Sequence, residues 1–374
     1  MDYLLELSKI VDGALARDQS KVIAYTEQLL KKMRTDGKEA EAGRLERSLR
    51  RSRGHELVAS KLAEADRIPV DGDSRLKLAD QSWVVAGDVR VVLTEPGQRV
   101  VDRFLTYVRN ADRLISRGVG VSPTMLLYGP PGCGKTETAR WIASQLSLPL
   151  VTARVDALIS SFLGNTAKNL RFLFEHVASR PCVLFLDEMD ALAKLRDDQH
   201  ELGELKRVVV SLLQNIDSLD GHTVMIAASN HPHLLDPAVW RRFSYKLEMS
   251  LPDPGQRLEM FRLFLGQWLT AEEDAAILVE VTEGMNGSDI RQLSQDAIRE
   301  AVIAGNDRID LDQFLYEIAS GKLPELTKAV DDKSRFVLLS KLSHRAFPNV
   351  RLARLFNVSE SKVSRHLKKE AANG

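Results

Sequence analysis

Residues 129–136, Gly-Pro-Pro-Gly-Cys-Gly-Lys-Thr, have the residue types and spacing of a phosphate-binding loop. They fit the pattern G-x-x-x-x-G-K-[ST], with an apolar run before it and a helix-forming stretch after it. Glycines let successive backbone N–H groups turn toward an anion, and the N-terminus of the following helix adds partial positive charge. Lys135 would neutralise the β- and γ-phosphates of ATP, and the Thr136 hydroxyl would ligate Mg²⁺. The residues expected to bind the nucleotide are Gly129, Pro130, Pro131, Gly132, Cys133, Gly134, Lys135 and Thr136.

Two carboxylates, Asp187 and Glu188, follow a second apolar run at 182–186. Ligands bind at the carboxyl ends of strands in open α/β sheets, which is where these acids would lie. Asp187 is expected to hold Mg²⁺ beside Thr136. Glu188 is expected to orient and polarise the attacking water.

A third apolar run, 224–229, ends at Asn230, whose amide could hydrogen-bond the γ-phosphate or the attacking water. Arg241 and Arg242 follow within the same region. Planar guanidinium groups suit phosphate, and an arginine delivered from a neighbouring molecule stabilises charge developing on the γ-phosphoryl group. Glu188, Asn230, Arg241 and Arg242 are therefore the predicted catalytic residues.

The surrounding sequence predicts an α/β nucleotide domain over 84–252, because short apolar runs alternate with helix-forming stretches. Such alternation is typical of a parallel sheet covered by helices on both faces. The predicted strands are Val89–Leu93, Thr124–Tyr128, Leu150–Val155, Val183–Asp187, Thr223–Ser229 and Tyr245–Met249. Four helices are expected over 253–320, at about 254–267, 271–281, 287–304 and 310–319.

The flanking segments differ from this core in their pattern. Residues 1–66 have helical periodicity and are expected to dock a partner or substrate, and 67–83 read as a linker. The chain has 52 basic and 52 acidic residues, so its formal net charge is zero. It has only two cysteines, which favours a reducing, cytoplasmic setting. We expect no signal peptide and no membrane insertion, because no basic leader or long apolar segment is present.

Over residues 85–320 these motifs, in this order, resemble the AAA family of ATPases, in particular the single-ring group that contains katanin and spastin. The segment Gly284–Ile290 is similar to the family's lid motif, which implies that Gly287 and Ser288 approach the nucleotide. The resemblance implies a P-loop AAA+ sheet with a helical lid. It also implies a homo-oligomeric ring, usually a hexamer, in which Arg241 and Arg242 act on the ATP of the neighbouring subunit.

The resemblance also implies a substrate-gripping pore loop at Phe162 and Leu163. Aromatic side chains offer a large contact area at low entropic cost, which suits gripping varied polypeptides. The alternative is that Phe162 packs inside its own subunit. The family's Gly-Glu-Ser-Glu sequence after the aromatic appears here as Gly164-Asn165-Thr166-Ala167, so two acids are missing.

Residues 331–374 resemble a bacterial helix-turn-helix unit. They hold ten basic and four acidic side chains, a net charge of +6, which is consistent with a phosphate footprint. Ser359 is a natural N-cap for the second helix. The residues expected to face DNA are Ser361, Lys362, Arg365, His366 and Lys369. The same shape also docks proteins, so both alternatives stay open.

Three functions agree with these patterns. The first is an ATP-driven ring that remodels or threads a polypeptide substrate, chosen directly or through an adaptor. The second is a DNA-associated ATPase switch that uses 331–374 in defence, transposition or transcription. The third is an unfoldase that serves a separately encoded protease. ATP and Mg²⁺ are the expected cofactors in all three.

Overall fold

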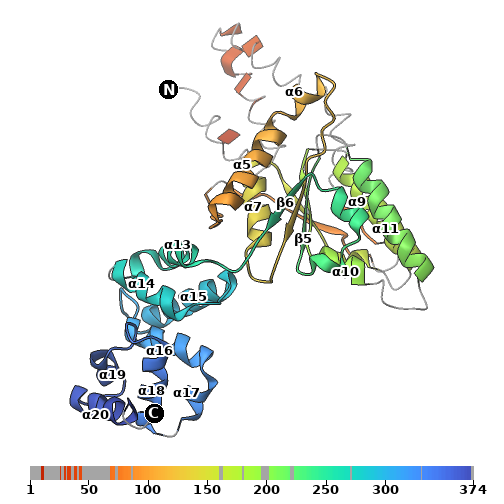
Figure 1. Ribbon diagram of the computed structural model, residues 1–374. Coiled ribbons are helices and arrows are strands. Elements are labelled where there is room, and N and C mark those ends of the chain that lie inside the picture. Colours follow the sequence, from red (N-terminus) through yellow and green to blue (C-terminus); the bar gives the residue numbers. More distant parts are fainter. Residues whose placement is uncertain are drawn as a thin grey trace. The chain divides into compact units, whose positions relative to one another are not determined.

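The computed structural model describes most of the chain after residue 67 (Figure 1). Its described residues are 68–71, 75–85, 87–159, 163–178, 181–194, 202–219, 223–269, 272–329 and 331–371, with isolated positions between 10 and 43. The internal contacts divide the chain into Met1–Ile68 and Pro69–Gly374. In the first unit Leu29, Leu30 and Ala42 are helical and buried.

The second unit contains a six-stranded, mostly parallel sheet whose spatial order is β1-β3-β4-β5-β2-β6. Only β1 runs antiparallel, against β3, and the other four pairings are parallel. The predicted α/β fold is confirmed. The strands are β1 (Ala79–Ser82), β2 (Thr124–Tyr128), β3 (Leu150–Ala153), β4 (Val183–Leu186), β5 (Val224–Ser229) and β6 (Tyr245–Glu248).

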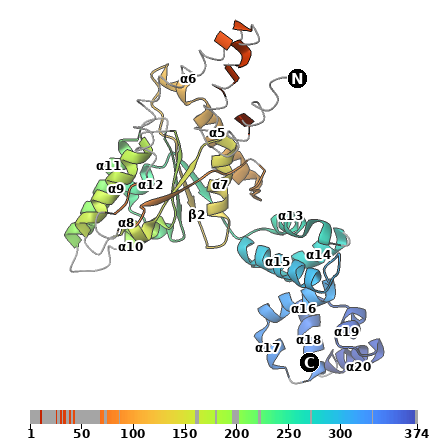
Figure 2. The same cartoon turned by 180° about the vertical axis from the view of Figure 1, so that it is seen from behind.

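Helices cover both faces of the sheet, as Figures 1 and 2 show. Helices α5 (Glu95–Arg109) and α7 (Lys135–Leu146) lie on one face, and α9 (Leu163–Ala178) and α11 (Leu202–Asp217) lie on the other. Alternate strand residues such as Met125 and Leu127 pack in the core under α5 and α7. Burial on both faces explains why these strands are continuous apolar runs. Shorter helices are α6 (Ala111–Ile115), α8 (Val155–Leu158), α10 (Met189–Lys194), η1 (Pro232–Leu234) and α12 (Pro237–Arg241).

Two local expectations are wrong. Val89–Leu93 forms no strand and instead lines a cavity that the phosphate-binding loop also lines. A strand does form at β1, within the segment 67–83 that the sequence suggested as a linker. Its sequence, Ala-Asp-Gln-Ser, lacks the apolar pattern of a buried strand, because β1 is an edge strand that pairs only with β3.

A helical lid follows the sheet, and its four predicted helices are confirmed. They are α13 (Pro254–Leu265, followed by η2 at Gly266–Trp268), α14 (Glu272–Val281), α15 (Gly287–Ile303) and α16 (Leu311–Lys322). Helix α13 begins with a reciprocal capping box between Asp253 and Gln256, and Pro254 occupies its first turn. These capping signals start the first lid helix at Pro254, shortly after the last strand, β6.

The C-terminal helices share one hydrophobic core with the lid. They are α17 (Pro324–Lys328), α18 (Asp332–Leu342), α19 (Asn349–Leu355) and α20 (Glu360–Ala371). Phe336, Phe347 and Val363 belong to the same buried cluster as Phe261 and Phe314 of the lid. Helices α19 and α20 are joined by residues 356–359, where Asn357 adopts a left-handed conformation with φ +49°. Removing residues 331–374 would therefore uncover lid core.

Candidate nucleotide site

The phosphate-binding loop connects the end of β2 to the start of α7, as the sequence predicts. Gly129 has φ +138°, and a Cβ atom there would lie 2.1 Å from the carbonyl oxygen of Met249. A backbone oxygen cannot rotate away as a side chain can, so only glycine fits between β2 and the residue that follows β6. The same absence of a side chain leaves the loop's backbone N–H groups open to an anion.

Lys135 is buried at the base of this loop. Its Nζ donates hydrogen bonds to the carbonyl oxygens of Gly129 at 2.8 Å and Pro130 at 2.7 Å. Burial lowers the pKa of the Lys135 ammonium group, whereas nearby Cys133 and Asp187 act in the opposite direction. The two carbonyl oxygens only partly balance the positive charge of the Lys135 ammonium group. An anion held by the loop would supply the remaining negative charge.

Asp187 and Glu188 lie at the carboxyl end of β4, beside the loop. Thr136 Oγ1 donates to Asp187 Oδ2 at 2.8 Å, which joins the two predicted Mg²⁺ ligands directly. The Glu188 N–H donates to Asp187 Oδ1 at 2.9 Å. Glu188 itself has φ +50° and an exposed side chain. Such a conformation costs on the order of 1–3 kcal/mol in a residue other than glycine and is common at functional sites.

Asn230 is held at the end of β5 by a residue that sequence reasoning missed. The Asn230 N–H donates to Asp190 Oδ1 at 3.2 Å, and Asp190 is only 4% exposed. Asp190 stands two positions after Glu188, at the start of α10. This short segment therefore supplies both the Glu188 carboxylate of the site and the Asp190 carboxylate that holds the backbone of Asn230. A buried acid needs hydrogen-bond partners, and a third acid two positions after Glu188 was the available signal.

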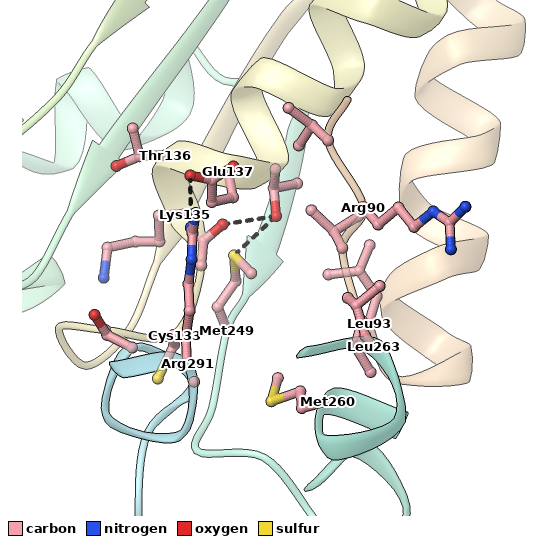
Figure 3. A pocket seen from close by; sticks show the side chains of 18 of the residues that line it. Arg90, Leu93, Cys133, Lys135, Thr136, Glu137, Met249, Met260, Leu263 and Arg291 are labelled. Atoms are coloured by element: carbon pink, nitrogen blue, oxygen red, sulfur yellow. Dashed lines mark hydrogen bonds and ion pairs between the residues drawn. The ribbon is translucent and has the colours of Figure 1, made fainter. Parts of the chain in front are cut away.

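A cavity of about 750 Å³ brings these residues together. Its polar wall includes Lys135, Thr136, Asp187, Glu188 and Asn230. Figure 3 shows Lys135 and Cys133 on one side of the cavity, with Leu93, Met260 and Leu263 on the other. The volume lies within the usual range for small-molecule sites, and an apolar wall opposite a phosphate cradle suits a nucleotide base. The apolar wall, formed by residues 89–93 together with α13, was not foreseen from the sequence.

The lid touches the phosphate-binding loop at Gly132. The Ser288 N–H donates to the Gly132 carbonyl oxygen at 3.0 Å. A Cβ atom at Gly132 would lie 2.4 Å from Oδ1 of Asn286, the residue that caps α15. Gly287 and Ser288 line the cavity, and their approach to a nucleotide stays a prediction. Arg291 lines it as well and contacts Glu137 at 3.4 Å, the ion pair drawn in Figure 3.

Of the remaining predicted site residues, those that the structure describes do not line this cavity. Arg241 and Arg242 are not among the residues that line the cavity. Phe162 lies outside the described residues, and Leu163 is described only as the first residue of α9. On α20, three of the five residues expected to face DNA are exposed, namely Ser361, Lys362 and Arg365. The His366 ring lies 6.3 Å from the Phe336 ring, and only the backbone of Lys369 is described.

Comparison with known proteins agrees with this geometry. Residues 125–251 match the family model described as ATPase family associated with various cellular activities (AAA). An uncharacterized AAA family ATPase of Sinorhizobium fredii is 38% identical over 224 residues, which are 60% of this chain and 68% of that protein. The chain belongs to the AAA family of ATPases. The phosphate-binding loop of this AAA protein, residues 129–136, lies within the matched residues.

Other relatives of this AAA ATPase carry more specific names. A proteasome-activating nucleotidase of Thermococcus kodakarensis is 34% identical over 209 residues, covering 54% of this chain and 53% of that protein. The 26S proteasome regulatory subunit S10B homolog B of Arabidopsis thaliana is 34% identical over 220 residues, covering 56% and 55%. The chain thus spans about half the length of these two relatives. No helix in the described ranges is both long and apolar enough to cross a bilayer.

Proposed function

We propose that this AAA ATPase forms a ring that uses ATP hydrolysis to unfold or remodel a polypeptide. The observation that carries the proposal is that one subunit brings only part of the predicted catalytic residues to the cavity. The phosphate-binding loop, both acids and Asn230 line one cavity, whereas Arg241 and Arg242 are absent from its lining. A site completed by a neighbouring subunit couples assembly to hydrolysis. Membership of the katanin and spastin group, and a hexameric count, remain predictions.

The residues of the cavity suggest how hydrolysis proceeds. The loop's N–H groups and Lys135 would hold the β- and γ-phosphates, and the lid would close on them through Ser288. Thr136 and Asp187 fit Mg²⁺, because their oxygens already lie 2.8 Å apart, and the ion would neutralise phosphate charge. Glu188 would take a proton from the attacking water, and Asn230 would orient that water.

The polypeptide substrate is inferred from the sequence of the pore segment and from the names of the proteasomal relatives. Phe162→Ala should lower the rate of substrate unfolding about 10-fold while ATP turnover stays within about twofold, because gripping and hydrolysis use different residues. The measurement is loss of fluorescence from a fluorescent protein with an unstructured tail.

The control for this experiment is Phe172→Ala, which removes an exposed phenylalanine from α9. This variant should unfold the substrate at the unchanged rate. Equal unfolding by Phe162→Ala and the unchanged protein would rule out threading by this residue. If unfolding is fast only when a proteasome-type protease is added, the protein serves a separate protease.

A second candidate function is DNA binding by α20, and a specific feature favours it. A groove of about 520 Å³ is lined by Ser361, Ser364, Arg365 and Lys368, together with Asn349 and Glu360. Other basic side chains of this region are engaged with lid acids: Arg345 pairs with Glu280, and Arg351 and Arg354 pair with Asp312. On α20, by contrast, Lys362, Arg365 and Lys368 are exposed and could contact a phosphate backbone.

The DNA function predicts that the double variant Arg365→Ala, Lys368→Ala weakens binding of a labelled duplex at low salt. It should also reduce the slope of log affinity against log salt by about 2, because each phosphate contact contributes about one. Point variants are preferable to truncation, since this region shares the lid core. Arg345→Gln is the matched control. If the unchanged protein binds no duplex at low salt, the DNA function is wrong.

A further inference from the structure

The neighbouring arginines Arg241 and Arg242 stand in different surroundings. Arg241 is exposed, and its side chain makes no ion pair or hydrogen bond within the described ranges. Arg242 is only partly exposed, at 33% of its side chain, and is bound within its own subunit. The two residues therefore do not present equivalent guanidinium groups to a neighbouring molecule.

Arg242 is anchored through both its side chain and its backbone. Its Nε donates to Asp217 Oδ1 at 3.1 Å, and its Nη2 donates to Asp217 Oδ2 at 2.9 Å. This two-bond pairing of a guanidinium with a carboxylate fixes the orientation of the Arg242 side chain and also balances its charge. Nη1 donates to the Ala238 carbonyl oxygen at 3.1 Å. The Arg242 carbonyl oxygen accepts a hydrogen bond from the buried Thr124 hydroxyl at 2.8 Å.

Helix α12, which carries Arg241, is too short for its own hydrogen bonds to hold it in a fixed orientation. Helix α12 has five residues, and such a helix is marginal without tertiary contacts. Its contacts are the buried Val239, the edge-on packing of Trp240 against Tyr128 at 5.1 Å, and the pairing of Arg242 with Asp217 at the end of α11. Figure 2 shows α12 beside α11.

Successive helical residues point about 100° apart. The Arg242 side chain is directed at Asp217, so the side chain of Arg241, the last residue of α12, points in another direction. Asp217 also closes α11, which packs along α9, the helix that begins after the predicted pore residue Phe162. Arg242 thus connects the end of α12 to α11, which in turn packs along α9.

We propose that Arg241 alone acts on the neighbouring subunit's ATP, and that Arg242 is a positioning residue that aims α12 through Asp217. The proposal rests on the ring function proposed above. For Arg242 to reach a neighbour's phosphate, it would have to give up both bonds to Asp217 and its bond to Ala238. Arg241 has no described bond to give up.

The test compares ATP turnover of Arg241→Ala, Arg242→Ala and Asp217→Asn in the full chain. Arg241→Ala should lower kcat about 10³-fold, as loss of an arginine finger does. Arg242→Ala and Asp217→Asn should each lower kcat on the order of 10-fold, by the same factor, with KM unchanged, because both only misalign Arg241. The combined variant should be no slower than either single variant, since both remove one interaction.

Unchanged kcat in Asp217→Asn overturns the proposal, whatever Arg242→Ala does. A second variant, Asp217→Arg with Arg242→Asp, restores the pair with its charges reversed. It should recover turnover toward the unchanged level, and failure to exceed Arg242→Ala would mean that Arg242 itself contacts phosphate. Mixing Arg241→Ala with Lys135→Ala subunits tests the ring separately. Mixed rings should be active, because one subunit supplies Lys135 and its neighbour supplies Arg241. Inactive mixtures would contradict the ring function, and they would leave the Asp217 comparison to decide the role of Arg242.

Discussion

Replacing Glu188 with glutamine should lower ATP turnover by about 10³-fold while ATP affinity stays within about threefold, because the amide cannot accept the proton of the attacking water. The side chain is exposed at the cavity wall and is not one of the groups that hold the loop or the lid. Gln keeps its size and its backbone bond to Asp187. Single-turnover hydrolysis and binding of a fluorescent ATP analogue measure the two effects separately.

The same substitution should accumulate the ATP-bound state and therefore the assembled ring. Sedimentation at saturating ATP should show a larger species for Glu188→Gln than for the unchanged protein. Glu259→Gln is the matched control, because Glu259 is an exposed lid residue paired with Arg262, and it should leave turnover and assembly unaltered. Unimpaired hydrolysis by Glu188→Gln would remove Glu188 from the mechanism. A purely monomeric variant at high ATP would count against the ring.

Replacing Gly129 with alanine should lower the free energy of unfolding by about 3 kcal/mol, since it combines backbone strain with an overpacked contact. The new Cβ would lie 2.1 Å from the Met249 carbonyl oxygen, and the residue has φ +138°. Relief requires a shift of the backbone between β6 and the lid, so ATP binding should also weaken. Urea denaturation followed by tryptophan fluorescence, together with nucleotide binding, measures both.

Gly305→Ala is the control that separates the cost of backbone strain from the cost of an overpacked contact. Gly305 has φ +72°, but no described atom lies within 4 Å of the position that a Cβ atom would take, so only the conformational cost of about 1 kcal/mol applies. The substitution should leave ATP binding unaltered, because Gly305 does not line the cavity. Equal destabilisation by the two substitutions would show that close approach to Met249 does not explain the glycine at 129.

Much of the site is readable from sequence because its parts follow local rules. A phosphate-binding loop must join a strand to a helix, and polar residues that end parallel strands meet at one sheet edge. Lys135, Asp187, Glu188 and Asn230 all line one cavity, and their roles in hydrolysis stay predictions. The lid helices were equally predictable, since capping signals and helical periodicity are local.

Other features depend on which distant segments pack together. Residues 89–93 line the same cavity as the phosphate-binding loop and the lid helix α13. An apolar run alone does not distinguish a strand from a cavity wall. The edge strand β1 is recognisable only by its pairing with β3. Likewise, the shared core of the lid and residues 331–371 appears only once their helices pack.

The sequence by itself determined that this AAA ATPase carries a phosphate-binding loop between a strand and a helix, with two acids and an asparagine at neighbouring strand ends. Chain connectivity and apolar periodicity are enough to bring those groups together. The tertiary structure alone decided that Arg241 and Arg242, adjacent in sequence, differ in surroundings. That difference depends on Asp217, twenty-five positions earlier, and a side-chain ion pair across such a separation is set by helix packing rather than by local spacing.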